Sequence, residues 1–362
     1  MGTLRVEHLY KSYGKVQAVR DVSFELENGQ FLFLLGPSGC GKTTTLRCIA
    51  GLEEPDRGKI YIDGRDVTDV PTEERGIAMV FQTWALYPNM NVFNNIAFPL
   101  KLRKVPKGEI SKRVKEVAEM LRIDNLLDRM PGELSGGESQ RVALGRAIVR
   151  EATIYCLDEP LTFLDALLRI QMRGELKLLQ KKLGITVLMV THDQVEATTM
   201  ADKIEVMNAG RIIQEGTPKE IYENPQHTFV AGFVGAPPTN LIDGDIDEEM
   251  GEYYFDAGAF KYGLSKNFIS AIRQAGRESL SGLTLGIRPE RIKFTEKETN
   301  IKGVIEVVEY EGPRATLDVR VDGYILKAVC DIVEIPRSDR VYLDWDEKEV
   351  FLFDKSSGNR II

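Results

Sequence analysis

A glycine-rich segment near the N-terminus combines the residue types and the spacing that bind a polyphosphate. Residues 36–43 read Gly-Pro-Ser-Gly-Cys-Gly-Lys-Thr; the apolar run Phe31–Leu35 precedes them, and a helix-like stretch, 44–50, follows. Strand, glycine-rich loop and helix in this order form the P-loop pattern, whose glycines turn backbone N–H groups toward a phosphate. Lys42 can reach the β- and γ-phosphates, and the Thr43 hydroxyl can ligate Mg²⁺. A chance glycine-rich turn is the alternative, but such a turn would not need the flanking strand and helix. The nucleotide-binding residues predicted in this loop are Gly36, Pro37, Ser38, Gly39, Cys40, Gly41, Lys42, Thr43 and Thr44.

Polar side chains also follow three other apolar runs of the chain. Gln82, the pair Asp158-Glu159 and His192 each come directly after one of these runs. Uninterrupted apolar strands that alternate with helices predict a parallel sheet covered on both faces. Ligands of such sheets collect at the carboxyl ends of the strands. We therefore expect these four residues to surround the nucleotide held by the P-loop.

The four residues have separate expected roles in nucleotide hydrolysis. Asp158 is expected to hold Mg²⁺ through water and to accept a hydrogen bond from Thr43. Glu159 is expected to orient and deprotonate the attacking water. His192 can donate to the γ-phosphate, and Gln82 can contact both the metal and the water. The alternatives are an acidic pair that caps a strand, a packed or capping histidine, and a glutamine without function.

A second helix start is shaped to accept an anion. In the segment Ser135-Gly136-Gly137-Glu138, the serine and the glutamate have capping-box spacing. The two glycines leave the N–H groups of the first helical turn uncovered. A plain helix cap with spare glycines is the alternative. Because the P-loop already supplies one phosphate site, the functional interpretation is that this helix start meets a nucleotide bound by another copy of the chain.

The periodicity of the chain predicts the elements that position these residues. The segments 4–10 and 21–26 alternate in strand fashion and predict an antiparallel β subdomain ahead of the P-loop. Residues 84–150 predict a helical subdomain. The pattern changes near a Gly-Ala-Pro-Pro linker, after which short strands predict a smaller all-β, OB-like barrel. We therefore expect an α/β P-loop NTPase domain over residues 1–238 and a β-rich domain over 239–362.

Composition and charge argue against several other classes of protein. No apolar segment approaches the roughly 20 residues of a transmembrane helix, so any membrane role is expected to be peripheral. The 4 cysteines are scattered and the chain has only 3 histidines, which favours a reduced, cytosolic protein without a structural zinc. Residues 241–362 carry 17 Lys and Arg against 24 Asp and Glu, and so hold most of the net charge of -8. Such an acidic region is a poor candidate for binding a nucleic-acid backbone.

These motifs occur in the order that is typical of ABC transporter ATPases, and the chain resembles that family from end to end. Within the family it is most similar to the ATP-binding subunits of maltose-type sugar importers. The resemblance rests on the motifs above, on the pair Leu164-Asp165, and on five further phrases, at 80–82, 85–88, 191–197, 229–235 and 286–290. The last two phrases are shared with importers of polyamines, iron or oxyanions.

The resemblance implies an ATPase that uses ATP and Mg²⁺ and works as a head-to-tail homodimer. Each ATP would lie between one P-loop and residues 135–138 of the partner subunit. Tyr13, which by position alone is equally well a half-buried turn residue, would stack on the adenine. Residues 83–100 would dock two membrane permease subunits at the cytoplasmic face of the membrane, and the permease would receive its solute from a solute-binding protein. The β-rich domain resembles the regulatory OB-type domains of these ATPases, and no nucleic acid is expected as a partner.

Two positions depart from the usual pattern of the family. Glu138 stands where Gln is commonest, so its contacts with the nucleotide of the partner subunit are expected to differ. Thr162-Phe163 replaces the usual pair of small residues. This replacement is expected to alter communication across the dimer without abolishing hydrolysis.

The leading hypothesis is an importer ATPase that couples the binding and hydrolysis of ATP to the uptake of a solute, with sugars as the first choice. The alternatives are an importer ATPase for polyamines, iron or oxyanions, a soluble ABC ATPase that acts on nucleic acid or ribosomes, and a mainly regulatory protein. Soluble ABC ATPases usually carry tandem cassettes or long coiled-coil insertions, and this sequence has neither.

Overall fold

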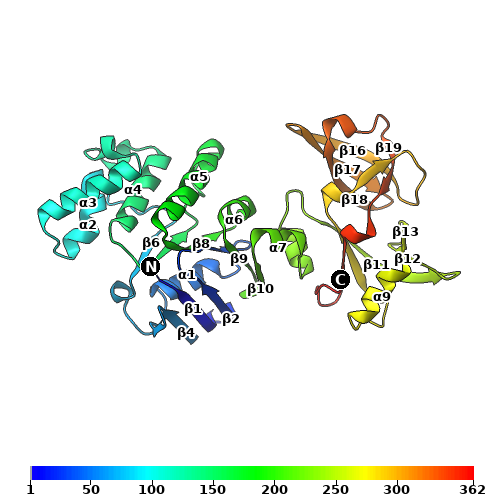
Figure 1. Cartoon of the computed structure of the whole chain (residues 1–362), viewed down its shortest axis with the longest axis horizontal. Helices are drawn as coiled ribbons and strands as arrows, with labels where there is room; N and C mark the ends of the chain where they lie inside the picture. Colours follow the sequence, from blue (N-terminus) through cyan, green and yellow to red (C-terminus); the bar gives the residue numbers. More distant parts are fainter. Residues whose placement is uncertain (1) are drawn as a thin grey trace. The chain divides into compact units, whose positions relative to one another are not determined.

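The computed structural model describes residues 2–362, which form two compact units (Figure 1). The first unit extends to Lys219, and the second covers Glu220–Ile362. Each unit has its own hydrophobic core. None of the helices in the described part of the chain has both the length and the apolar composition that a membrane span requires.

A six-stranded sheet forms the centre of the first unit. Its strand order is β10-β9-β3-β8-β7-β6, and all neighbours except β10 and β9 run parallel. The strands are β3 (Phe31–Leu35), β6 (Ile77–Val80), β7 (Ile154–Asp158), β8 (Thr186–Thr191), β9 (Lys203–Asn208) and β10 (Arg211–Gly216). Every residue of β3, β7 and β8 is buried, because parallel strands are covered on both faces. The parallel sheet predicted from the apolar runs is therefore confirmed.

The two strands ahead of β3 pair antiparallel, as expected, and two further strands, which follow the glycine-rich loop, complete their sheet. Its order is β2-β1-β4-β5, and its strands are β1 (Leu4–Tyr13), β2 (Val16–Leu26), β4 (Arg57–Ile62) and β5 (Arg65–Asp66). One hydrophobic core includes side chains of this sheet, of the parallel sheet and of α1 (Lys42–Ala50), such as Val6, Leu34 and Leu46. This shared core fixes α1 against the strand that leads into the loop.

The helical subdomain expected over residues 84–150 is present. It contains α2 (Val92–Leu102), α3 (Lys107–Met120) and α4 (Gly136–Ile148), and the helices α5 (Ala166–Leu183) and α6 (Gln194–Met200) follow β7 and β8. Polar side chains begin four of these five helices, because their oxygens satisfy N–H groups of the first turn that have no partner within the helix. These N-caps are Asn91, Ser135, Asp165 and Asp193.

The second unit is mostly β-structure. Its two five-stranded sheets have the orders β13-β12-β11-β14-β20 and β15-β19-β16-β17-β18, and one core joins their inner side chains. The first sheet contains β11 (Asn240–Glu249), β12 (Glu252–Asp256), β13 (Lys261–Leu264), β14 (Leu283–Ile287) and β20 (Val350–Asp354). The second contains β15 (Lys293–Thr295), β16 (Lys302–Glu311), β17 (Arg314–Val321), β18 (Tyr324–Asp331) and β19 (Arg340–Asp344). The β-rich character predicted from the short strands is confirmed.

One helix within these strands was not anticipated from the sequence. The helix α9 (Lys266–Gln274) begins after Ser265, whose side chain caps it, and it buries Phe268, Ile269 and Ile272. The spacing of these apolar residues is that of one helix face, and the serine is a helix-start signal. The sequence therefore did contain the local pattern for α9.

The contacts of the chain place the boundary between the units at 219/220 instead of the expected 238/239. Residues 220–238, which were expected in the first domain, therefore belong to the second unit. They contain the end of α7 (Pro218–Glu223) and all of α8 (Thr228–Phe233). The proline-containing stretch interpreted as a linker therefore lies inside the second unit. One buried side chain makes several of the contacts that hold it there.

That side chain is Arg288, which is 3% exposed. Its guanidinium donates to the backbone carbonyl oxygens of Tyr222, Ala231 and Val234, and it lies 4.1 Å over the ring of Tyr222. A planar cation with several donors can bind several carbonyls of an irregular segment at once. Arg288 thus ties residues 220–238 to the β-structure that follows them.

Replacing Arg288 by Leu should lower the free energy of unfolding of the second unit by about 3 kcal/mol, because three buried carbonyls lose a charged donor. Denaturant titration would measure this loss through the fluorescence of Trp345, which is buried in the second unit, in a Trp84→Phe background. Arg291→Leu is the matched control, since the exposed ion pair of Arg291 with Glu349 (3.2 Å) should contribute less than about 1 kcal/mol. Equal losses in the two variants would contradict the role given to Arg288.

Candidate active site

The glycine-rich loop packs so closely on neighbouring backbone that two of its positions accept only glycine. Gly41 has a φ of 107°, and a Cβ placed on it would lie 2.2 Å from the carbonyl oxygen of Ala18 in β2. A Cβ on Gly36 would lie 2.2 Å from the carbonyl oxygen of Met207 in β9. A side chain at either position would force the loop away from the sheets. The loop conformation is therefore fixed by β2 and β9 as well as by its own sequence.

Lys42 and the start of α1 form the cationic side of the loop. The Lys42 side chain is 4% exposed, and its Nζ donates to the carbonyl oxygens of Gly36 (2.8 Å) and Pro37 (2.9 Å). The N-cap of α1 is Gly41, which has no side chain to cover the first N–H groups of the helix. These N–H groups and the ammonium are the donors that a polyphosphate requires.

Thr43 and Asp158 join α1 to the end of β7. The Thr43 hydroxyl donates to Asp158 Oδ1 at 3.0 Å, as predicted. Asp158 is 6% exposed, and burial raises the pKa of its carboxyl, while the hydrogen bond from Thr43 acts in the opposite direction. A hydroxyl and a carboxylate oxygen side by side are hard ligands that suit Mg²⁺, whose other positions water and phosphate oxygens can fill. The residues present therefore fit the expected metal.

Three side chains converge on one oxygen of Glu159. Its Oε2 accepts from Gln82 Nε2 (3.3 Å) and Thr162 Oγ1 (3.2 Å), and it lies 3.0 Å from His192 Nδ1. The φ of Glu159 is 43°, which a non-glycine residue adopts at a cost in free energy. The strained backbone and the three contacts hold this carboxylate in one orientation. Gln82, Glu159 and His192 thus meet as predicted, and Gln82 contacts the proposed base.

The segment that carries His192 is anchored by buried polar groups. Thr191 Oγ1 donates to Glu196 Oε2 at 2.6 Å, and Asp193 caps α6. Glu196 is buried, and this burial raises the pKa of its carboxyl to about 7. His192 itself is half exposed, so its second ring nitrogen can reach a ligand. Sequence reasoning did not identify Thr162 or Glu196 as part of this arrangement, although each lies within four residues of a predicted site residue.

An arginine of α4 holds the segment that follows Gln82. Arg146 donates to the carbonyl oxygens of Trp84 (2.8 Å) and Ala85 (2.7 Å). Trp84 Nε1 in turn donates to the carbonyl oxygen of Pro160 at 3.3 Å, one residue after Glu159. Trp84 and Ala85 both have positive φ values, so this backbone is held in a conformation that it would not adopt alone. A shift of this segment would therefore act on both α4 and the site.

The capping box predicted at the start of α4 is confirmed. The backbone N–H of Ser135 donates to Glu138 Oε2 (2.7 Å), and the N–H of Glu138 donates to Ser135 Oγ (3.4 Å). The first of these bonds is the main reason why the pKa of the Glu138 carboxyl is lowered. A Cβ on Gly136 would contact Trp84 and Leu164, not the glycine-rich loop. The proposed contact of this helix start with a nucleotide of another copy stays a prediction.

Tyr13 lies at the end of β1, and the residue is 46% exposed. The ammonium of Lys11 lies 5.5 Å from the centre of this ring. An exposed aromatic face is available for stacking. The expected contact of Tyr13 with an adenine also stays a prediction.

Comparison with known proteins identifies relatives over the whole chain. The ABC transporter family model matches residues 19–162, and the TOBE domain model matches residues 285–353. The trehalose/maltose import ATP-binding protein of Thermococcus litoralis is 47% identical, over 100% of both chains. The oligosaccharides import ATP-binding protein of Bacillus subtilis is 43% identical, also over 100% of both chains. The sn-glycerol-3-phosphate import ATP-binding protein of Psychromonas ingrahamii is 43% identical, over 100% of this chain and 96% of that protein.

Solved structures match part of the chain. A protein of Clostridium perfringens that is part of an ABC transporter complex superposes with a TM-score of 0.56 at 31% identity, covering 60% of this chain and 89% of that one. A dimeric ATP-binding cassette in a post-hydrolysis state, with ADP and phosphate bound, superposes with a TM-score of 0.54 at 30% identity. It covers 59% of this chain and 98% of its own.

Thr162→Val should lower kcat for ATP hydrolysis about fivefold and leave ATP affinity unchanged. The substitution keeps the shape of the side chain but removes the hydroxyl that orients Glu159, a hydrogen bond worth about 1 kcal/mol. Steady-state hydrolysis and nucleotide titration would measure the two quantities. Thr162→Ser retains the hydroxyl and should keep the activity of the unchanged protein; a loss of kcat in both variants, or in neither, would contradict the role of this hydrogen bond.

Proposed function

The chain belongs to the ABC transporter family of ATP-binding proteins, and from this premise we propose that it is the ATP-hydrolysing subunit of an importer for sugars. The convergence of Gln82, Thr162 and His192 on Glu159, beside the Thr43–Asp158 pair, carries this proposal. A site that only held a nucleotide would need the glycine-rich loop but not a carboxylate oriented by three groups. The proposal of a sugar rests on the relatives, two of which are import proteins for trehalose/maltose and for oligosaccharides.

The residues of the site have complementary roles in the proposed hydrolysis. Mg²⁺ bound with ATP next to Thr43 and Asp158 would offset the negative charge between the β- and γ-phosphates. Glu159 accepts the proton of the attacking water, and Gln82 helps to position that water. His192 donates to Glu159 through Nδ1–H, and the imidazolium form, which carries a proton on both ring nitrogens, can also donate to the γ-phosphate through Nε2. The loop, with Lys42, holds the phosphates that the reaction separates.

We propose that the working unit is a head-to-tail homodimer. The start of α4 offers backbone N–H groups at Gly136 and Gly137 to an anion, as does the glycine-rich loop. Each nucleotide would then lie between the loop of one subunit and the α4 start of the other. Tyr13 would stack on the adenine. Support for this arrangement comes from the dimeric ATP-binding cassette that superposes on 59% of this chain.

We further propose that residues 83–100 dock two permease subunits at the cytoplasmic face of the membrane, and that a solute-binding protein delivers the solute to them. Support comes from the contacts of Arg146, which link this segment to α4, and of Trp84, which link it to Pro160 beside the base. Movement of a docked loop would therefore reach both nucleotide-binding elements. The second unit, which is acidic and contains the TOBE match, would serve as a contact and regulatory surface and not as a nucleic-acid binder.

Glu159→Gln should reduce kcat by about 10³-fold, because a general base typically contributes 10²–10⁴-fold. ATP affinity should stay unchanged, and ATP should trap a dimer that size-exclusion chromatography can detect. Glu151→Gln provides a control. Glu151 is an exposed acidic residue that precedes β7, whereas Glu159 follows it, and the ion pair of Glu151 with Arg113 lies outside the site. Turnover by Glu159→Gln within tenfold of the unchanged protein would contradict the assignment of the base.

Glu138→Gln should strengthen ATP-dependent dimerisation. The Glu138 carboxylate occupies the helix start that is proposed to meet the nucleotide of the partner subunit, so its charge opposes a polyphosphate. Gln keeps the capping-box acceptor without the charge. Analytical ultracentrifugation in a Glu159→Gln background would measure the ATP concentration at which half of the protein is dimeric. This concentration should fall about fivefold, which corresponds to about 1 kcal/mol in the free energy of dimerisation.

Glu133→Gln is the matched control for this experiment. Glu133 makes the same type of reach-back contact, with the backbone N–H of Met130 at 2.7 Å, but it has no proposed contact with a nucleotide. Its substitution should leave dimerisation unchanged. If Glu138→Gln dimerises as the unchanged protein does, or more weakly, the proposed contact of this helix start with the nucleotide of the partner subunit is wrong.

A further inference from the structure

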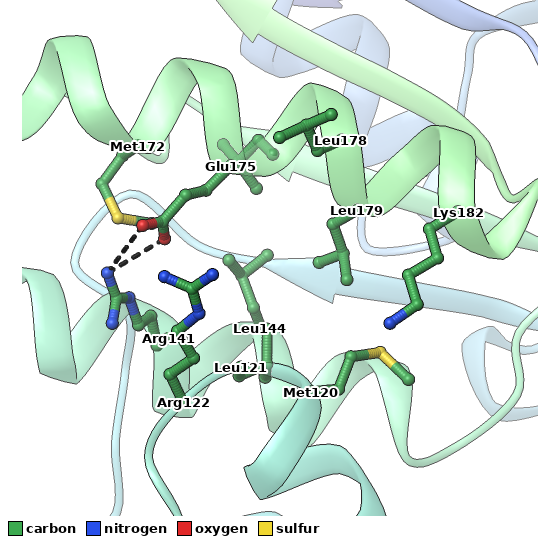
Figure 2. A pocket seen from close by; sticks show the side chains of 11 residues that line it. Met120, Leu121, Arg122, Arg141, Leu144, Met172, Glu175, Leu178, Leu179 and Lys182 are labelled. Atoms are coloured by element: carbon green, nitrogen blue, oxygen red, sulfur yellow. Dashed lines mark hydrogen bonds and ion pairs between the residues drawn. The ribbon is translucent and has the colours of Figure 1, made fainter.

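A pocket of the first unit lies between the end of α3, α4 and α5, and none of the residues that line it belongs to the candidate active site (Figure 2). Its volume is about 190 Å³. Leu121, Leu144 and Leu179 form an apolar floor, and Figure 2 shows the side chains of Arg122 and Lys182 on either side of Leu144, each from a different element. The pocket therefore combines an apolar surface with cationic side chains from different elements.

The pocket has more positively charged side chains than negatively charged ones. Arg141, a third cation of the pocket, pairs with Glu175, with its Nη2 2.9 Å from Oε2 and 3.0 Å from Oε1. Glu175 also accepts from Gln171 Nε2 at 2.8 Å, so its charge is already engaged. Within residues 2–362, no acidic side chain pairs with Arg122 or Lys182. A local excess of two positive charges thus faces an apolar floor in a chain whose net charge is -8.

The backbone at Arg122 adds an independent observation. Arg122 has a φ of 56° directly after α3, and the N–H groups of Arg122 and Ile123 bond to the carbonyl oxygens of Glu119 (3.1 Å) and Ala118 (2.9 Å). This pattern is a Schellman motif, whose left-handed position usually holds glycine. A long cation stands here at a position where glycine would relieve backbone strain. Its side chain projects over the pocket.

We propose that this pocket binds a small organic anion, namely a carboxylate carried on an apolar body of one short acyl chain or one aromatic ring. The apolar body would lie on the leucine floor, and the carboxylate would lie between Arg122 and Lys182. The volume is sufficient, because a cavity of about 150 Å³ lined by apolar side chains binds benzene. Such a ligand would contact both α4 and α5, and its binding does not depend on the proposed transport function.

Sodium octanoate is a suitable probe, with 1-octanol at the same concentration as its uncharged counterpart. Saturation-transfer NMR and the shift of the thermal unfolding midpoint of the full chain would measure binding. Octanoate should bind the unchanged protein and raise its midpoint relative to sodium chloride of equal ionic strength. Octanol should bind at least about tenfold more weakly, since it cannot make charge-assisted hydrogen bonds.

Two variants remove the cations, and each has a matched control. Arg122→Gly should weaken octanoate binding about tenfold while raising the unfolding midpoint without ligand, because glycine suits the left-handed position. Lys104→Gly makes the corresponding change at another left-handed position (φ 57°) outside the pocket. Lys182→Gln should weaken binding by a similar factor, whereas Lys181→Gln, its neighbour on α5, should not.

The measurements with these variants distinguish a site at Arg122 and Lys182 from binding elsewhere. Loss of octanoate binding in Arg122→Gly and Lys182→Gln alone supports the site. Equal binding by all five proteins, equal binding of octanol and octanoate, or no binding of octanoate to the unchanged protein would each overturn it. Because Arg122→Gly is expected to be the more stable protein, loss of binding in this variant would not reflect unfolding.

Discussion

The parallel pairing of β3 with β8, and of β8 with β7, brings Leu35, Thr191 and Asp158 to one edge of the sheet. The chain leaves each strand at that edge, so the residues that follow are neighbours although they are far apart in the sequence. The glycine-rich loop, Glu159 and His192 occupy this edge for that reason. The burial of β3, β7 and β8 on both faces keeps the register fixed, because a slip would remove apolar side chains from the core.

Backbone conformations with a positive φ occur at the functional edge and are maintained by the packing around it. Gly41 turns the loop into α1 where the carbonyl of Ala18 leaves no room for a side chain. Glu159 adopts a left-handed conformation without being glycine, and its N–H bonds to the carbonyl oxygen of Val190 in β8 at 3.0 Å. The sheet thus stabilises a conformation that holds the carboxylate against Gln82, Thr162 and His192.

Buried or half-buried arginines hold irregular segments of both units. Arg75 donates to the carbonyl oxygens of Cys48, Ile49, Thr68 and Val70, Arg146 holds Trp84 and Ala85, and Arg288 holds the segment 220–238. In each case one guanidinium satisfies several carbonyls that have no partner in a helix or strand. Segments without regular structure therefore gain defined positions. The segment after Gln82 is one of them, and its displacement would move both α4 and the residues beside Glu159.

The elements that could be predicted from the sequence have local signals: the glycine-rich loop, the buried strands that end in Gln82, Asp158-Glu159 and His192, and the capping box of Ser135 with Glu138. Each of these depends on hydrogen bonds and burial patterns within a few residues of chain, so residue type and spacing are enough to predict it. Three further contacts became visible only in the folded chain: Thr162 joins Gln82 on Glu159, Arg146 bonds the segment after Gln82, and Arg288 bonds the segment 220–238. The tertiary structure also places Arg122 and Lys182 at one pocket. These contacts depend on where strand ends and helices meet in space, which the spacing of residues along the chain does not specify.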